Sequence, residues 1–209
     1  MADPSTAKIY ASISPPVEGY QHPSGRALAE LLKKQVPELA VEWAETEATI
    51  KLHDSSAPAF TAVATIDADS FELLSTPHLN IAALDRVAGR LARAIGYAYC
   101  IIADCGIPLS VYLTPKVFFQ DKPIQPSLKP PKLEPIENWR GFLEQRLQHL
   151  ELERAIPPAP IMQLLDFASD VESASIIRLK TQPGLLRLRL EHQDFVTEMH
   201  FNGSFPDGY

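Results

Sequence analysis

The sequence contains few of the residues that common cofactor motifs require. Only nine of its 209 residues are glycine, and it has neither a Gly-x-Gly-x-x-Gly segment nor a Walker-type loop. Backbone cradles for nucleotide phosphates are therefore not expected. It has two cysteines and six histidines, without the second cysteine pair or close histidine pair that would complete a zinc site. We predict that the protein binds no cofactor and no metal ion.

The two cysteines, Cys100 and Cys105, lie in one predicted strand and in the turn that follows it. Along an extended strand they are too far apart for a disulfide bond unless the chain reverses between them. We therefore predict two reduced thiols, as is usual in the cytosol.

Long apolar runs and an excess of positive charge are also missing. No segment approaches the roughly 18 apolar residues of a membrane-spanning helix, and residues 1–8 lack the apolar centre of a signal peptide. We expect a cytoplasmic protein without a membrane partner. The net charge of −7 argues against an extended surface for nucleic acid, although it is compatible with a local basic patch.

The composition that is present, 45% hydrophobic and 22% charged, is that of a globular protein. Its clearest pattern is an apolar stripe at spacings of three and four, which predicts a helix over residues 81–94 with Asn80 as its N-cap and Gly96 at its end. Arg86, Arg90 and Arg93 lie on the opposite side of this helix. They predict either a solvated helix face or a cationic patch.

The remaining patterns predict an α+β fold with a mainly antiparallel sheet packed by amphipathic helices. Before the 115–135 segment we expect strands at 8–13, 47–53, 60–66, 97–103 and 109–114, a helix at 26–36 capped by Ser24, and a short helical turn from Asp69 to Leu74. After it we expect a helical pair, from Ile136 to near Ala155 and over 161–168, followed by a three-stranded meander at 175–181, 185–191 and 195–201.

Proline density suggests where the chain divides. Six prolines fall within residues 115–135, which favours extended chain over regular hydrogen-bonded structure. We predict an α+β domain over 1–114, a linker or arm over 115–135, and a helix pair with a meander over 136–209, which could also pack with the first domain. Phe118 and Phe119, at the start of the arm, either tuck back onto the first half or contact a partner.

The last hairpin provides the most specific surface prediction. A two-residue turn at Pro183-Gly184 would place Lys180 opposite Arg187 and Arg178 opposite Arg189 on one face. Four cations on one sheet surface repel one another, which an acidic partner would relieve. The alternative is a solvated face with splayed side chains, partly neutralised by Glu198. An L-Pro-Gly turn twists the wrong way for an ideal hairpin, so the register stays open.

For chemistry, the best local candidate is the turn containing Asp104 and Cys105, at the end of an apolar strand. A nucleophilic Cys105 needs a histidine base, and only tertiary folding could bring one there. We expect the histidines at 149, 192 and 200 to be surface or interface side chains.

These features favour a non-catalytic protein that binds another protein. Candidates are a specific inhibitor, an immunity-type or chaperone-like partner, or a small subunit of a complex. The predicted binding residues are Arg178, Lys180, Arg187, Arg189, Phe118 and Phe119. A small enzyme using Asp104 and Cys105, and a basic-face module for phosphate-bearing ligands or nucleic acid, are the alternatives.

Overall fold

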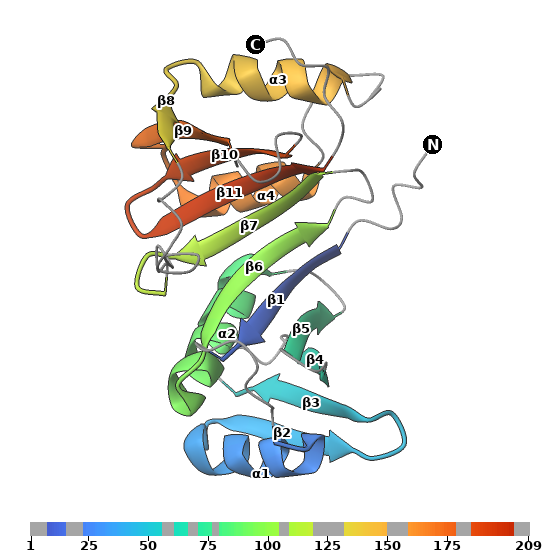
Figure 1. Cartoon of the computed structure of the whole chain (residues 1–209). Helices are drawn as coiled ribbons and strands as arrows, with labels where there is room; N and C mark the ends of the chain where they lie inside the picture. Colours follow the sequence, from blue (N-terminus) through green and yellow to red (C-terminus); the bar gives the residue numbers. More distant parts are fainter. Residues whose placement is uncertain are drawn as a thin grey trace, which may run out of the picture. The chain divides into compact units, whose positions relative to one another are not determined.

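The alternating and helical patterns of the sequence form an α+β fold, as predicted (Figure 1). The computed structural model describes residues 8–15, 23–55, 61–66, 71–76, 80–104, 109–118, 132–149, 159–178 and 185–202. Within these ranges there are four helices, and the strand pairs are antiparallel wherever their register is defined. No helix in the described ranges is long and apolar enough to cross a membrane.

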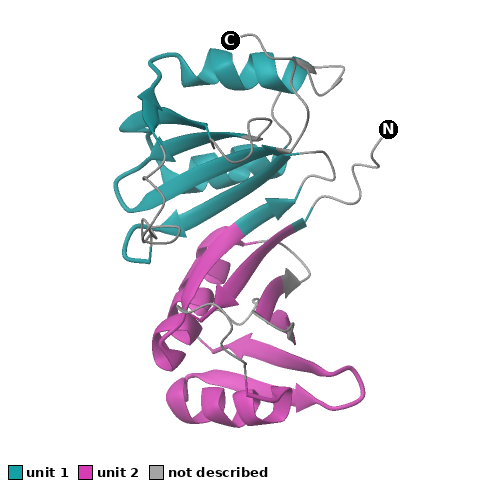
Figure 2. Ribbon diagram, in the orientation of Figure 1, with its two compact units in different colours: residues 1–8, 102–209 teal, residues 9–101 magenta. Residues whose placement is uncertain are grey.

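The chain divides into two units (Figure 2). Residues 9–101 form one, here called the N-terminal unit, and residues 102–209 with residues 1–8 form the other, here called the C-terminal unit. The division falls between Ile101 and Ile102, inside a strand. The domain boundaries near 114 and 135 stay a prediction, and residues 119–131 of the proposed arm lie outside the described residues.

The N-terminal unit is a sheet with two helices on one face. Its strands follow the spatial order β2-β3-β4-β5-β1-β6. The elements are β1 (Lys8–Ser14), α1 (Gly25–Gln35), β2 (Leu39–Ala44), β3 (Thr49–Asp54), β4 (Thr61–Ile66), β5 (Phe71–Thr76), α2 (Ile81–Ile95) and β6 (Ala98–Asp104), which crosses into the C-terminal unit.

Local signals place the two helices where the sequence predicts them. The side-chain oxygen of Asn80 accepts a hydrogen bond from the Ala83 amide at 3.0 Å, and Gly96 adopts φ 72°, so α2 begins and ends at its predicted caps. Ser24 caps α1 in the same way, with 3.4 Å from its hydroxyl to the Ala27 amide. Leu84 and Leu91 are fully buried, so the apolar stripe of α2 faces the core.

Two strands of this unit differ from the prediction. β2 has no counterpart among the predicted strands. The predicted helical turn from Asp69 to Leu74 is wrong, because the chain from Phe71 forms β5, which pairs with both β4 and β1. Phe71 and Leu73 are both fully buried. Their spacing of two residues matches a strand, and a six-residue segment takes that structure when a neighbour is present on each side.

The C-terminal unit repeats the plan of helices on a sheet. Its strands follow the order β7-β11-β10-β9-β8. The elements are β7 (Leu109–Pro115), β8 (Leu133–Pro135), α3 (Trp139–His149), α4 (Ala159–Ala168), β9 (Ser173–Arg178), β10 (Leu185–Glu191) and β11 (Phe195–Asn202). The predicted helical pair and meander are confirmed, whereas the short strand β8 was not expected at the end of the proline-rich segment.

Both helices of this unit contact the same face of the sheet. Phe142 of α3 packs edge-on against Phe201 with ring centroids 6.4 Å apart, and Phe167 of α4 contacts Phe195 at 5.5 Å. Phe195 and Phe201 are an even number of residues apart on β11, so their side chains lie on one face. The other face carries Arg187, Arg189, Glu198 and His200, and it is here called the open face of the C-terminal unit.

Candidate functional site

The open face of the C-terminal unit carries ionisable side chains from three neighbouring strands. The antiparallel register sets Arg187 opposite His200 and Arg189 opposite Glu198. On the other side of β11, Glu198 lies opposite Tyr112 of β7. Because opposite residues in an antiparallel pair share a face, these five side chains form one polar surface.

Close contacts hold this surface in defined orientations. Arg189 donates from Nε to Glu191 Oε1 at 2.7 Å, and its Nη2 lies at the same distance from that oxygen. Glu198 Oε2 lies 3.1 Å from His200 Nε2 and 3.9 Å from Arg187 Nη1. The His200 ring also packs against Tyr112 with centroids 4.5 Å apart. The surface is therefore a network of paired charges.

Lys116 extends the network at the end of β7. Its Nζ lies 3.5 Å from Glu172 and 3.8 Å from Glu191, and its backbone amide donates to the Asp194 carbonyl at 2.8 Å. Phe118 follows in the same turn, half-buried, with its amide bonded to the Pro115 carbonyl. Phe118 therefore lies two residues after Lys116, which contacts the network through Glu191.

The predicted cationic face is not formed as expected. In the structure Leu186 lies opposite Arg178, and Arg187 lies opposite Ile177, a register displaced by three residues from the prediction. An odd displacement moves a side chain to the other face, so Arg178 lies on the opposite face from Arg187 and Arg189. Lys180, Phe119 and the Pro183-Gly184 turn lie outside the described residues.

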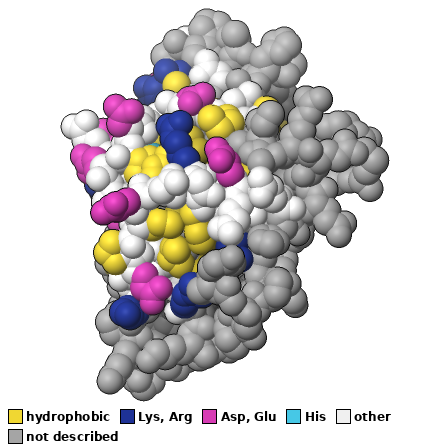
Figure 3. Space-filling view, turned by 90° about the horizontal axis from the view of Figure 1, so that it is seen from above, with side chains coloured by type: hydrophobic (Ala, Val, Ile, Leu, Met, Phe, Trp, Pro, Cys, Tyr) yellow, Lys and Arg dark blue, Asp and Glu magenta, His cyan; other side chains and the backbone are white. Residues whose placement is uncertain are grey.

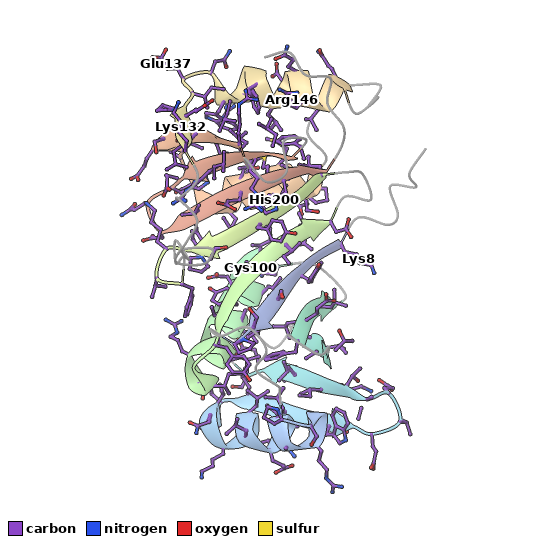
Figure 4. All side chains as sticks on the ribbon, in the orientation of Figure 1. Lys8, Cys100, Lys132, Glu137, Arg146 and His200 are labelled. Atoms are coloured by element: carbon purple, nitrogen blue, oxygen red, sulfur yellow. The ribbon has the colours of Figure 1, made fainter. Side chains whose placement is uncertain are left out.

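Arg178 instead belongs to a second group beside α3. Its Nε lies 3.5 Å from Glu134 on β8, and Lys132 lies 3.7 Å from the same carboxylate. Arg146 of α3, labelled with Lys132 in Figure 4, is buried with its guanidinium 5.2 Å from the Phe142 ring. Burial, and next the charge of Arg178, lower the pKa of Arg146.

Acidic and basic side chains are also interspersed on the face of the molecule shown in Figure 3. In its described part, neither sign of charge forms a separate patch.

The arginines predicted to form a patch on α2 contact a buried carboxylate. Arg86 donates to Asp54 Oδ2 from Nε at 3.2 Å and from Nη2 at 2.8 Å, and Arg90 Nη1 lies 3.8 Å from Asp54 Oδ1. Asp54 is 1% exposed. Two of the three predicted patch arginines are therefore partners of a buried carboxylate.

A tyrosine–carboxylate pair connects the same helix to β6. Tyr99 of β6 donates from its hydroxyl to Asp85 Oδ1 at 2.6 Å. Burial raises the pKa of Asp85 against the opposing effects of Tyr99 and Arg93, and burial together with the Asp85 carboxylate raises the pKa of Tyr99. Perturbed pairs of this kind occur at functional sites and in structural networks alike. Here the pair joins α2 to the sheet.

In the C-terminal unit, His192 likewise joins a helix to the sheet. It is fully buried, with Nδ1 3.0 Å from the Ser169 carbonyl and Nε2 2.8 Å from Thr197 Oγ1. A carbonyl only accepts, so Nδ1 carries the proton and Nε2 accepts from the Thr197 hydroxyl. Burial lowers the pKa of His192. The expectation that His192 is a surface or interface side chain is wrong, because it joins the end of α4 to β11.

The other residues considered for metal binding or catalysis form no candidate site among the described residues. No group of three or more His, Cys, Asp or Glu side chains there could hold a metal ion. Cys100, labelled on β6 in Figure 4, forms no disulfide, and burial raises the pKa of its thiol to about 12. Asp104 ends β6 at an exposed position, and Cys105 lies outside the described residues. A Cys105 site stays a prediction.

Sequence and structure comparisons add no relative. No protein-family model matches the chain, and no curated protein or solved structure shows a significant similarity to it.

Proposed function

We propose that this chain is a non-catalytic protein of the cytosol that binds another protein through the open face of its C-terminal unit. A specific inhibitor, an immunity-type or chaperone-like protein and a small subunit of a complex all belong to this class. The unpaired thiol of Cys100 fits a reducing compartment, which supports the cytosolic part of the proposal.

The observation that carries the proposal is the ordered charge pattern on β10 and β11. The side chains of Arg187, Arg189, Glu191 and Glu198 are between 12% and 29% exposed, so they are partly exposed and restrained by one another. A partner that binds such a surface loses little side-chain freedom. Charges of both signs at fixed positions also select a complementary pattern and disfavour other partners.

The pairing of these charges changes the chemistry expected of the partner. Arg187 and Arg189 each have a carboxylate within reach, so a uniformly acidic partner would meet Glu191 and Glu198 as well. A partner with both signs of charge fits this face better. Phe118, two residues after Lys116, remains a proposed contact residue, and Phe119, which lies outside the described residues, remains a predicted one. Arg178 and Lys180 stay predicted binding residues, although Arg178 would contact a partner on the opposite face.

The proposal is tested by capture from the native source with two matched variants. Neutral Arg187→Gln with Arg189→Gln removes both cations and keeps hydrogen-bonding side chains. Charge reversal to Glu is a poorer choice, because new carboxylates would face Glu191 and Glu198. The control is Arg26→Gln with Lys34→Gln on α1, where both side chains are exposed and the change in net charge is the same.

We expect a stoichiometric protein partner to be retained by the native chain and by the α1 control, and to be lost or weakened by at least about tenfold in the β10 variant. Circular dichroism and thermal unfolding establish that both variants are folded. Equal capture by all three proteins would contradict the assignment of this face, and absence of any partner would contradict the binding role itself.

Two alternative functions remain, each with its own measurement. A thiol-reactivity profile of Cys105 against pH tests the enzyme prediction, since a nucleophilic cysteine reacts at lower pH than an ordinary thiol. Binding to an anionic polymer at low salt, with a steep salt dependence, would support the module for phosphate-bearing ligands. No contact between described residues favours either alternative over protein binding.

A further inference from the structure

The terminal strands of the two units differ in how they resist further strand pairing. β8, at the end of the C-terminal order, has three residues, one of which is Pro135, and Glu134 lies on it. Short length, proline and charge are the usual devices that protect a sheet edge. β2, at the end of the N-terminal order, has six residues, no proline and a single charged side chain, Glu42. β2 therefore lacks two of these devices, short length and proline, and has only one charge along six residues.

The helix beside β2 lies on the face of the sheet. α1 contacts β3 as well as β2, and it also contacts α2. A helix that covered the outer edge of β2 would not reach the second strand or α2. The described neighbours of β2 therefore leave one row of its backbone N–H and C=O groups available for a further strand.

We propose that this edge is a site of self-association, in which β2 of one copy pairs antiparallel with β2 of a second copy. This goes beyond the proposed function, since it uses the other unit of the chain. The argument rests on the sequence of the strand, Leu39 to Ala44, which complements itself in one register.

The faces of the strand restrict the possible registers. Leu39 and Val41 are buried on the helix-covered side, whereas Ala40 and Glu42 are exposed on the other side. Opposite residues in an antiparallel pair share a face. Pairings that set an even-numbered residue opposite an odd-numbered one would place the helix-covered side of one copy beside the exposed side of the other, so they are disfavoured.

Two registers near the strand centre place the helix-covered sides of the two copies next to each other. One is centred on Glu42 and the other on Val41. With Glu42 opposite Glu42 of the second copy, two like charges face each other, which is unfavourable. With Val41 opposite Val41, each Glu42 faces Ala40, and each half-exposed Trp43 faces Leu39. The second register joins apolar side chains on the helix-covered side and leaves no like charges directly opposed. We assign this register to the dimer.

The test is the dimer dissociation constant, measured by sedimentation equilibrium on the full chain. Ala40→Lys creates two Lys–Glu42 pairs between copies and should lower the dissociation constant about fivefold, whereas Ala40→Glu should raise it about fivefold. Position 40 is exposed, so both variants are expected to fold, and circular dichroism checks this.

Glu42→Gln distinguishes the two registers. With Val41 opposite Val41 it should change the dissociation constant less than about twofold, whereas with Glu42 opposite Glu42 it should strengthen the dimer. The Arg187→Gln, Arg189→Gln variant should dimerise like the native chain, which separates this inference from the proposed partner site. A native chain that remains monomeric at every concentration, or equal affinities for Ala40→Lys and Ala40→Glu, would overturn the proposal.

Discussion

The two units attach their helices to their sheets with different buried polar groups. In the N-terminal unit a carboxylate, Asp54, is buried at the end of β3 and bonded by Arg86 from α2. In the C-terminal unit a neutral imidazole, His192, connects the Ser169 carbonyl after α4 to Thr197 on β11. Both contacts join distant segments, but one depends on charge and the other on a single tautomer.

This difference has an energetic consequence. A buried ion loses a large hydration energy, so it depends on its partner more strongly than a neutral group does. A neutral hydrogen-bonded group loses less when one bond is removed, but it responds to protonation near neutral pH when it is a histidine. The N-terminal contact should therefore be sensitive to mutation, and the C-terminal contact to pH.

The largest expected effect is that of Arg86→Leu. It leaves the carboxylate of Asp54 buried beside the more distant Arg90, whose Nη1 lies 3.8 Å from Asp54 Oδ1, and should lower the free energy of unfolding by about 3 kcal/mol. Hydrogen exchange resolved by segment should show the loss of protection in α2 and β3. Arg93→Leu is the matched control on the same helix, because Arg93 bonds a backbone carbonyl, that of Gly89. Equal effects of the two variants would contradict the role of Asp54.

His192→Leu should destabilise the C-terminal unit by about 2 kcal/mol. The substitution leaves the Ser169 carbonyl and the Thr197 hydroxyl without these bonds, and Thr197 is fully buried. Loss of exchange protection should centre on α4 and the start of β11. Thr197→Val, which removes only one of the two bonds, should have about half the effect. If His192→Leu left the free energy of unfolding unchanged, packing alone would hold α4 on the sheet.

The pH dependence of stability should arise in the C-terminal unit. The folded-state pKa of His192 is lowered from its usual value of 6.5, so the unfolded chain binds the proton more readily. The free energy of unfolding should therefore be constant above about pH 7.5 and decline as pH falls through about 6.5. Urea unfolding along a pH series measures this decline. The decline in the free energy of unfolding should be smaller in His192→Leu. If that variant shows the same decline as the native chain, other titrating groups cause the pH dependence.

The smallest expected effect on stability is that of Arg187→Gln with Arg189→Gln. Paired charges on a partly exposed strand surface contribute little to folding, so we expect a loss of less than about 1 kcal/mol. A large loss in thermal unfolding would mean that the network on the open face is structural. It would then be unsuitable as evidence for partner binding.

Elements with a complete local signal were predictable from the sequence. α2 has a capping side chain, an apolar stripe and a terminal glycine, and each of these acts within a few residues along the chain. α4 has an apolar stripe as well, and its residues Ile161, Leu164, Leu165 and Ala168 are all buried. The meander at the end was also predicted, because its strands alternate and are joined by short segments.

Features that depend on distant segments were not predictable. β5 has only Phe71 and Leu73 as a strand signal, and its structure depends on β1 and β4 at its sides. The register of the last hairpin was wrong because the predicted two-residue turn was the only local guide. Burial of Asp54 depends on Arg86, which lies 32 residues further along the chain.

The sequence by itself thus determined the α+β class and the positions of the amphipathic helices, because propensity, capping and periodicity act over a few residues. Only the tertiary structure decided which charges meet. Whether Arg178 lies with Arg187, or whether Asp54 and His192 are surface groups or buried contacts, depends on strand register and helix packing. Those depend on residues far apart in the chain, which local patterns do not encode.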